Sequence, residues 1–246
     1  MYSPSVIDRH LLIPNWCYED TPVEYLRRTR EGYDCDISYE EYRELRRKSY
    51  YACVWYPKLI NEKIPVIDSV LVSLQDLQQA MIDYPDYKFV RTCGSSPKDL
   101  GDCIYNTYEA AHKALMQSRR TLDIFSQAHY HILLREVVKI EVECRCFVHQ
   151  RKLRAVSIYC YLNNEELEMF KESLVEFFEL YGDKLPYNSA VVEVCKVDDF
   201  PMIVEFNSFG VDQYSGASLF DWDEDKEILY NSTEPVFRMP GEFEWT

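Results

Sequence analysis

The chain has 246 residues, 47% of them hydrophobic, which is enough for one large domain or two closely joined lobes. Its formal net charge of −15 argues against a general nucleic-acid binder, because such proteins need a basic surface. No signal peptide or apolar run of transmembrane length stands out, and nine irregularly spaced cysteines indicate reduced thiols, so we expect a cytoplasmic protein with no membrane partner.

Two helix starts are predicted in the first fifty residues. At each, a capping residue is followed three positions later by glutamate, in the segments Thr21–Glu24 and Ser38–Glu41. Gly32 would end the first helix, and the second would run to about Tyr51. The second helix carries four basic residues, Arg43, Arg46, Arg47 and Lys48. They indicate a solvent-exposed face, with a phosphate or partner contact as the alternative.

Short strands and helices alternate in the middle of the chain. Strands are predicted at 69–72 and 88–93, and helices from Ser73 to before Pro85, from a capping box at 106–109 to about Arg119, and at 121–126. The polar loop 94–99 carries backbone N–H groups that fit an anion, although an ordinary connection is the simpler alternative.

A strand, a hairpin and a long helix are predicted next. The strand is 131–138, and the hairpin pairs 142–148 with 153–161 around a turn at 150–152. Alternation along the first hairpin strand places Glu143, Arg145 and Phe147 on one face. Asn163 and Glu166 form a capping box for a helix that runs to Tyr181 and ends at Gly182.

A second hairpin near the C-terminus carries the polar residues that most need an explanation. Its strands are 190–196 and 201–207, with a short link between them. Alternation puts Ile203, Glu205 and Asn207 on one face, and pairing of the two strands would bring Glu205 next to Glu193. Two carboxylates about 4 Å apart repel by roughly 4 kcal/mol at an effective dielectric of 20. Such a pair needs a proton on one group or a cation between them.

Carboxylate and amide oxygens suit magnesium better than zinc. Magnesium held by few carboxylates usually completes its coordination with phosphate oxygens. We therefore hypothesise that Glu193, Glu205 and Asn207 form the metal-binding wall of a nucleotide site, with a solvent-exposed acidic hairpin as the alternative. A zinc set fits less well, because its one-residue spacings are unusual: His129, His131, Cys144 and Cys146. No Ser-His-Asp or Cys-His arrangement identifies a catalytic residue.

The order of helices and hairpins lacks a regular βαβ rhythm, which predicts an α+β fold rather than a doubly wound sheet. We expect an N-terminal lobe at 1–133, of which 1–66 is mainly helical, and a C-terminal lobe at 134–246 that contains the hairpin metal wall.

Six segments of the chain, in this order, resemble the cell division cycle protein 123 family, a branch of the ATP-grasp fold. They are Phe89–Asp99, Leu133–Glu136, Glu143–Val148 with Lys152-Leu153, Val192–Val194, Ile203–Phe209 and Leu219–Trp222. The resemblance covers roughly residues 86–238, and it implies ATP bound between two α+β lobes with magnesium on the C-terminal lobe.

The resemblance also implies individual contacts. Arg91 stands where the family has a phosphate-contacting lysine, and the loop that follows is matched by Ser95, Ser96, Lys98 and Asp99. Arg135 and Glu136 fall at the hinge that would hold the adenine edge. Glu143 falls at a nucleotide or ribose contact, and Arg145 at a phosphate contact. Glu193 and Glu205 replace aspartates, Asn207 matches, and Ile158, Tyr159 and Cys160 replace a polar Gln-Arg-Asp run. From the residues alone, Arg91 and Arg145 are equally well explained by ion pairs, with Arg145 neutralising Glu143 or a cross-strand acid.

Three functions follow as alternatives. The family's eukaryotic members are ATP-dependent chaperones that help assemble translation initiation factor 2, so the resemblance implies an ATP- and magnesium-binding protein whose lobe arrangement binds a protein client, such as an initiation factor subunit. The second is an ATP-grasp ligase, which joins a carboxylate to an amine or thiol through an acyl phosphate, or a slow ATPase. The third is a nucleotide-free scaffold. None of them involves direct contact with nucleic acid.

Overall fold

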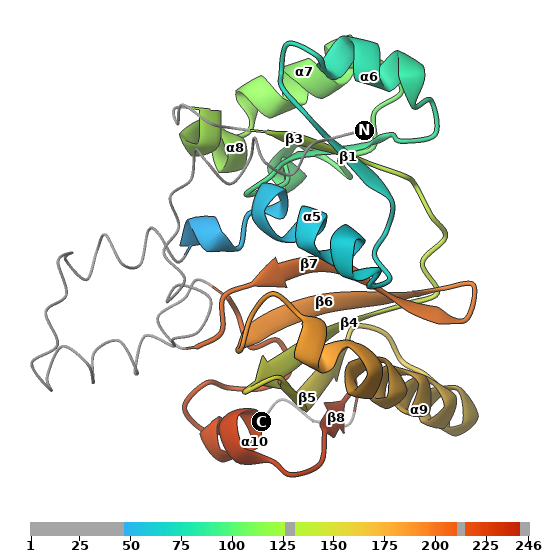
Figure 1. The fold of residues 1–246 in the computed structure, drawn as a ribbon, viewed down its shortest axis with the longest axis vertical. Helices are drawn as coiled ribbons and strands as arrows, with labels where there is room; N and C mark the ends of the chain where they lie inside the picture. Colours follow the sequence, from blue (N-terminus) through green and yellow to red (C-terminus); the bar gives the residue numbers. More distant parts are fainter. Residues whose placement is uncertain (1–46, 126–130, 211–214, 242–246) are drawn as a thin grey trace, which may run out of the picture. The chain divides into compact units, whose positions relative to one another are not determined.

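The computed structural model of this chain describes residues 47–125, 131–210 and 215–241 (Figure 1). The first predicted helix and the second up to residue 46, including Arg43 and Arg46, lie outside the described residues. The described end of the second is helical at 47–49, and Arg47 and Lys48 there are half-buried rather than fully exposed. The described chain divides into two compact units, of which unit 1 contains 51–57 and 67–139, and unit 2 contains 47–50, 58–66 and 140–241. Within these described ranges, no helix is both long enough and apolar enough to cross a bilayer.

Unit 1 is built on a three-stranded antiparallel sheet with the order β1-β3-β2. The strands are β1 (Ser69–Val72), β2 (Phe89–Thr92) and β3 (Ile132–Arg135), as the apolar runs in the sequence predict. Helices α6 (Leu77–Asp83) and α7 (Tyr108–Gln117) pack their apolar sides on one face of this sheet (Figure 1). The core between them is formed by Leu77, Ala80, Val90, Ala111, Leu115, Ile132 and Leu134.

Helices α6 and α7 of unit 1 begin later than the sequence predicts. Ser73 does not cap α6, because Asp76 occupies the N-cap position; the Ser73 hydroxyl accepts from the Asp76 N–H at 3.2 Å and donates to the Asp76 carboxylate in the turn before the helix. Thr107, rather than Asn106, caps α7 by accepting a hydrogen bond from the backbone N–H of Ala110. The helix predicted to reach Arg119 ends at Gln117, and α8 (Arg119–Phe125) follows, in agreement with the predicted short turn. Short polar side chains compete with helical backbone bonding, so such boundaries are the least predictable part of a helix.

Helix α5 (Ala52–Glu62) is missing from the sequence prediction because Pro57 stands inside it. Proline removes a backbone donor and is expected to end a helix. Trp55 and Leu59, on either side of it, are almost fully buried, and this burial offsets the lost hydrogen bond. The boundary between the two units falls within α5, because residues up to Pro57 belong to unit 1 and the remaining residues of the helix belong to unit 2.

Unit 2 is built on a five-stranded sheet with the order β7-β6-β4-β5-β8. Its strands are β4 (Val142–His149), β5 (Lys152–Ile158), β6 (Ala190–Val197), β7 (Phe200–Asn207) and β8 (Val236–Arg238), all antiparallel except for β5 with β8. Both predicted hairpins are confirmed. Each turns on two residues with positive φ, Gln150 and Arg151 in the first and Asp198 and Asp199 in the second, as the twist of paired strands favours.

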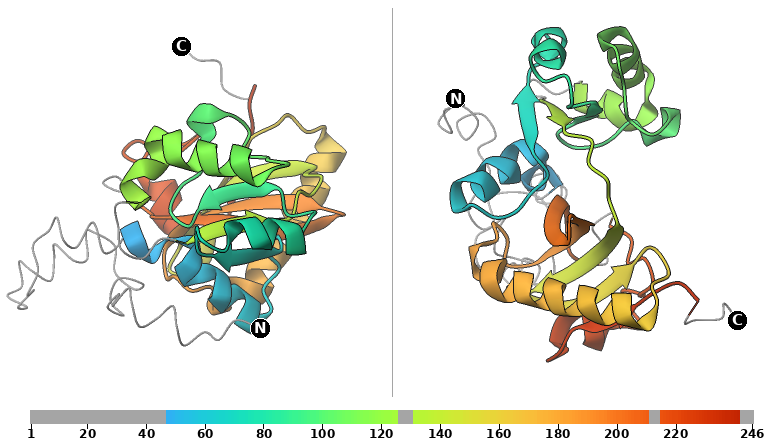
Figure 2. Two further views of the ribbon diagram at one scale, coloured as in Figure 1. Left: turned by 90° about the horizontal axis from the view of Figure 1, so that it is seen from above. Right: turned by 90° about the vertical axis from the view of Figure 1, so that its right-hand side faces the viewer.

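Helix α9 (Asn164–Tyr181) runs across one face of this sheet (Figure 2). Its capping box, predicted from the sequence, is formed by Asn163 and Glu166. The apolar side of the helix is buried through Leu167, Phe170, Leu174, Phe177 and Phe178. Gly182 follows with a φ of −53°, so the glycine is not needed for a left-handed turn. A side chain there would place its Cβ 2.9 Å from the carbonyl oxygen of Arg151, and this close approach explains the glycine.

An aromatic cluster covers one end of the opposite face of the sheet. It consists of Phe147, Phe209, Phe220, Trp222 and Tyr230, together with Leu229 of helix α10 (Lys226–Asn231). The rings of Phe209 and Trp222 lie 5.0 Å apart edge to face, a favourable arrangement for aromatic pairs. Phe209, at the end of the segment Ile203–Phe209, and Phe220 and Trp222 of the segment Leu219–Trp222 therefore share one core.

Candidate functional site

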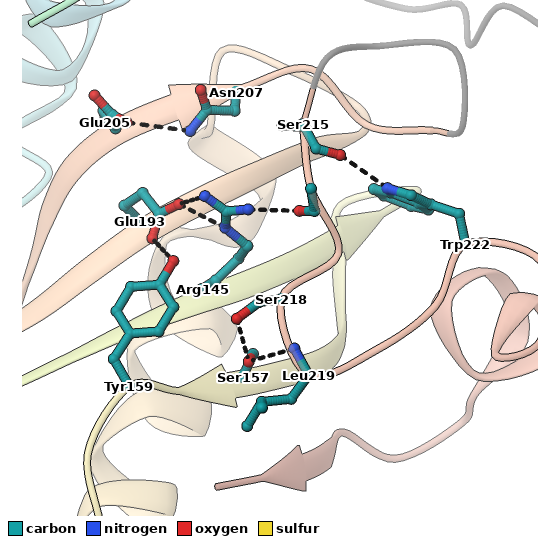
Figure 3. Close-up of polar contacts among 11 residues, drawn as sticks. Arg145, Ser157, Tyr159, Glu193, Glu205, Asn207, Ser215, Ser218, Leu219 and Trp222 are labelled. Atoms are coloured by element: carbon teal, nitrogen blue, oxygen red, sulfur yellow. Dashed lines mark hydrogen bonds and ion pairs between the residues drawn. The ribbon is translucent and has the colours of Figure 1, made fainter. Parts of the chain in front are cut away.

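Neighbouring strands of unit 2 place polar side chains in a row on the sheet face that α9 does not cover (Figure 3). Arg145 of β4 lies opposite Ser157 of β5 and Glu193 of β6, and Glu193 lies opposite Glu205 of β7. Cross-strand partners point to the same side of a sheet, so the register alone gathers these groups. The predicted pairing of Glu193 with Glu205 is confirmed.

Glu193 is buried, with 4% of its surface exposed, and its carboxylate accepts hydrogen bonds at both oxygens. Oε1 accepts from Arg145, at 2.7 Å from Nε and 2.6 Å from Nη2, and Oε2 accepts from the Tyr159 hydroxyl at 2.8 Å. The guanidinium of Arg145 thus supplies positive charge next to the neighbouring carboxylates of Glu193 and Glu205, which the sequence predicts would otherwise repel each other. Arg145 pairs with a cross-strand acid, as one of the two sequence interpretations predicts.

Burial is the largest influence on the pKa values of Glu193, Tyr159 and Arg145. Burial raises the pKa of Glu193, Glu205 raises it further, and the charge of Arg145 and the Tyr159 hydrogen bond oppose the shift without cancelling it. Burial also raises the pKa of the Tyr159 hydroxyl, with the Glu193 charge as the second cause, so Tyr159 is a hydrogen-bond donor at neutral pH. Burial works to lower the pKa of Arg145, but its acidic neighbours raise the pKa overall.

Glu205 and Asn207 lie two residues apart on β7, the strand at one end of the five-stranded sheet. The Asn207 amide donates to Glu205 Oε1 at 3.4 Å. A bulge leaves one extra residue in β7 next to Glu193, so that Ile203 pairs with Val194 rather than continuing the row. The simple alternation predicted for Ile203, Glu205 and Asn207 is therefore interrupted, and only the last two join the polar row.

The backbone at 215–219 is fastened beside Arg145 by side chains of the sheet and the aromatic cluster (Figure 3). Arg145 Nη1 donates to the carbonyl of Gly216, and Trp222 Nε1 donates to the carbonyl of Ser215 at 2.9 Å. Ser157 Oγ accepts from the Leu219 N–H at 3.1 Å and lies 2.9 Å from Ser218 Oγ. Sequence reasoning missed these partners, because nothing near Ser157 or Gly216 in the chain signals a contact more than sixty residues away.

The oxygen donors of this row fit a divalent cation by their chemistry. Two carboxylates and one amide oxygen match the preference of magnesium, which is commonly held by one or two carboxylates and substrate phosphates. Among the described residues, no three His, Cys, Asp or Glu side chains are grouped to hold a metal ion. A metal here would therefore be held by Glu205, Asn207 and Glu193, with further oxygens from a ligand.

The zinc alternative gains no support from the geometry. Cys144 and Cys146 have their sulfur atoms 3.6 Å apart and are fully buried within β4. They alternate with Arg145 along the strand and so point to the other face of the sheet. His129 lies outside the described residues.

The phosphate residues predicted in unit 1 have structural contacts of their own. Arg91 is 9% exposed and donates through Nε to the carbonyl of Thr92 at 3.1 Å. Ser95 donates to the carbonyl of Arg120, Ser96 is buried, and Lys98 is exposed at the start of a short 3-10 turn.

Asp99, in the same loop, accepts hydrogen bonds from the Ser118 hydroxyl and from the Arg119 N–H at the start of α8. The loop that follows β2 is thus tied to α8, and its anion-binding role stays a prediction.

The predicted hinge residues lie at the end of β3. Arg135 is 4% exposed, donates to Ser69 Oγ at 3.3 Å and lies over the ring of Phe89, while Glu136 is exposed. Sequence reasoning missed the neighbouring carboxylate of Asp68, which accepts from the hydroxyls of Tyr56 at 3.1 Å and Tyr87 at 2.5 Å.

Burial is the main cause that raises the pKa of Tyr56 to about 12. Like Tyr159, this tyrosine is therefore a hydrogen-bond donor at neutral pH.

Comparison with known proteins identifies related chains. The family model D123 matches residues 98–241. The putative CDC123-like protein L884 of Acanthamoeba polyphaga mimivirus is 27% identical over an alignment of 190 residues, and the alignment covers 68% of this chain and 59% of that protein. The chain therefore spans less than two thirds of this relative.

Two solved structures of Cdc123 from Schizosaccharomyces pombe, one of them truncated at its C-terminus, align with TM-scores of 0.66 and 0.65 at 16% identity. Each alignment covers 78% of this chain and 96% of the solved chain. This likeness confirms the predicted α+β, ATP-grasp-like fold. Because the family model covers more than half of its residues, including the whole polar row, the chain belongs to the D123 family, which is the cell division cycle protein 123 family that its motifs resemble.

Proposed function

We propose that this chain binds ATP with magnesium on the polar row of unit 2 and uses the bound nucleotide to control the binding of a protein client. The observation that carries the proposal is the ordered Arg145–Glu193–Glu205 row, because it places a fixed guanidinium next to oxygen donors on adjacent strands. Guanidinium recognises phosphate, and the carboxylates and Asn207 supply the oxygens that magnesium prefers. Bound magnesium would neutralise phosphate charge. Arg145 would bind and orient the phosphate, and the carboxylates and Asn207 would hold the ion.

Arg145 is suited to a phosphate because its geometry is fixed before any ligand arrives. A guanidinium has five N–H donors, of which three are engaged by Glu193 and Gly216. At most two remain for a ligand. A side chain that is already oriented loses little conformational entropy on binding, and this favours affinity.

The client is proposed from family membership. The family's eukaryotic chaperones imply a protein client of the class of initiation factor subunits, and the acidic chain favours a client with a basic surface. Titration of the chain into purified initiation factor 2 subunits, with and without ATP and magnesium, tests this step. A client affinity that is equal with and without nucleotide would contradict nucleotide control.

The nucleotide site is tested by thermal unfolding with ATP and magnesium. Ligand at about 100 times its dissociation constant should stabilise the folded chain by about 2.7 kcal/mol. The double variant Glu193→Gln, Glu205→Gln should lose this gain. The matched control is Glu168→Gln, Glu172→Gln on the exposed side of α9, which changes the net charge equally and should keep it.

If the double variant at the polar row responds to ATP and magnesium like the natural chain, the site assignment is wrong. If ATP and magnesium stabilise neither the natural chain nor the double variant, the nucleotide-free scaffold is favoured. Release of ADP that depends on an amine or thiol acceptor would instead favour the ligase.

A further inference from the structure

The carboxylate of Glu193 has few acceptor positions left for a metal ion. A carboxylate offers about four lone-pair sites, two on each oxygen. Oε1 accepts two N–H groups of Arg145 and is therefore fully used, while Oε2 accepts one O–H group from Tyr159. One lone pair on Oε2 remains, so Glu193 can coordinate a metal through a single oxygen only.

Arg145 keeps Oε1 covered because it is held from both sides. Its Nη1 donates to the carbonyl of Gly216, while Nε and Nη2 bind Glu193 (Figure 3). Any metal contact with Glu193 must therefore use Oε2, the oxygen that the Tyr159 hydroxyl already binds.

Tyr159 stands just beyond the end of β5 and is 40% exposed. Its backbone N–H donates to the carbonyl of Glu143 at 3.0 Å, which fixes the direction from which the phenol ring reaches Glu193. The hydroxyl is the only polar group of the ring, so it can be removed without changing the apolar contacts. It draws electron density from Oε2 and occupies space next to it, and both effects oppose a cation.

On the basis of the proposed function, we propose that Tyr159 is a positioning residue that occupies one of the two lone pairs of Oε2, the oxygen of Glu193 that Arg145 leaves uncovered, and thereby weakens divalent-metal binding at the Glu193–Glu205–Asn207 row. The sequence places this tyrosine in a segment that departs from the polar run typical of the family. The departure thus sets metal affinity in this chain rather than only removing a phosphate contact.

The test compares Tyr159→Phe with the natural chain in binding of Mn²⁺, measured by the electron paramagnetic resonance of the free ion, with ATP and without it. Tyr159→Phe should bind Mn²⁺ about tenfold more tightly, the factor that corresponds to one hydrogen bond to a charged group. Tyr161→Phe is the matched control, since Tyr161 is 72% exposed and lies two residues further along, and its affinity should equal that of the natural chain.

Glu205→Gln tells the two proposals apart. If Glu205→Gln weakens Mn²⁺ binding but Tyr159→Phe binds like the natural chain or more weakly, the role of Tyr159 is overturned and the metal site stands. If no variant binds Mn²⁺ even with ATP, both proposals fail. If Tyr159→Phe binds Mn²⁺ more tightly than both the natural chain and Tyr161→Phe, the role of Tyr159 is supported. This holds also when binding by the natural chain is too weak to measure. A thermal melt of each variant confirms that it is folded.

Discussion

Arg145 and Glu193 show how one pair of residues can serve both structure and ligand binding. The side chain of Glu193 is 5% exposed and that of Arg145 is 20% exposed, so the pair is shielded from water on one side only. Removing both charges from water is expensive, and the pair compensates through three hydrogen bonds to the carboxylate. The arginine is open enough to meet a phosphate, whereas the glutamate serves mainly to hold it.

The cost of breaking this pair can be measured. Glu193→Gln keeps the shape of the side chain but leaves the Arg145 charge without its partner. We expect a loss of about 3 kcal/mol in the free energy of unfolding, the low end of the range for a broken buried pair, because Arg145 is 20% exposed. Urea unfolding at pH 7 measures it. Glu168→Gln is the control, because its pair with Lys171 is a surface pair, which should contribute less than about 1 kcal/mol. Equal losses in the two variants would show that the buried pair has no special role.

Some site residues are predictable from the sequence and others are not. Glu193 and Glu205 follow from strand alternation and a short hairpin link, since these rules act over neighbouring residues. Tyr159 and Gly216 meet the row only because β5 and the loop after β7 come together in the folded sheet. The burial of Arg91 and Arg135 was equally unpredictable, because arginine is usually exposed and the packing of β1, β2 and β3 decides otherwise.

At the scale of elements, local signals predict helix ends well where a side chain caps the backbone. The start of α9 agrees with the sequence because Asn163 and Glu166 act on their own turn, whereas the glycine at its end, Gly182, is required by the close approach of the Arg151 carbonyl rather than by a local turn. Helix α5 was missed because its stability comes from tertiary burial around Pro57 rather than from local preference. The predicted hairpins succeeded for the same reason as α9, since each needs only two turn residues.

The cap of α9 gives a second measurable prediction. Asn163→Ala removes the side-chain acceptor for the Glu166 N–H, and we expect a loss of about 1 kcal/mol in the free energy of unfolding. Chemical denaturation followed by circular dichroism measures the loss. Asn164→Ala, at the exposed first position of the helix, keeps the cap and should stay within about 0.5 kcal/mol of the natural chain. A larger effect at Asn164 than at Asn163 would mean that the cap is not what fixes this helix start.

The contact between α10 and β8 depends on pH. Asp225, at the start of α10, binds both Nη atoms of Arg238 at 2.6 and 2.7 Å, and Arg238 lies over the ring of Phe220. Burial works to raise the pKa of Asp225, but the hydrogen bonds and charge of Arg238, with the backbone N–H of Asp221, lower it overall. A lowered carboxyl pKa stabilises the fold above the unfolded value near 3.9, and this stabilisation is lost as pH falls through the folded pKa.

Asp225→Asn should therefore lower the free energy of unfolding by roughly 1–3 kcal/mol at pH 7, the range for hydrogen bonds to a charged group. At about pH 3 the difference between variant and natural chain should be smaller than at pH 7, because the carboxyl of the unfolded chain is then largely protonated and the stabilisation from the lowered pKa is being lost. Urea unfolding at the two pH values checks the sign. A difference that grows as the pH falls would contradict the lowered pKa.

The whole molecule carries a large negative charge, which acts on stability in a way that no single pair does. Asp and Glu number 42 against 27 Lys and Arg, giving the net charge of −15. Exposed glutamates follow one another at helical spacing along α9, as in Glu168, Glu172 and Glu176, so repulsion is also local. Folding concentrates this charge, and self-repulsion destabilises the compact state.

Salt should therefore stabilise this chain. Raising the ionic strength from 0.01 to 0.15 M shortens the screening length from about 30 Å to about 8 Å, which weakens long-range repulsion between exposed carboxylates. The partly buried Arg145–Glu193 and Asp225–Arg238 pairs are screened less, because water and ions reach them less readily than exposed charges. The net effect is an expected rise of a few degrees in the melting temperature in NaCl, with sucrose of equal osmolality as the control for a general solute effect. A fall in melting temperature with salt would mean that attraction between exposed ion pairs outweighs the net repulsion, and it would remove the electrostatic argument for a basic client.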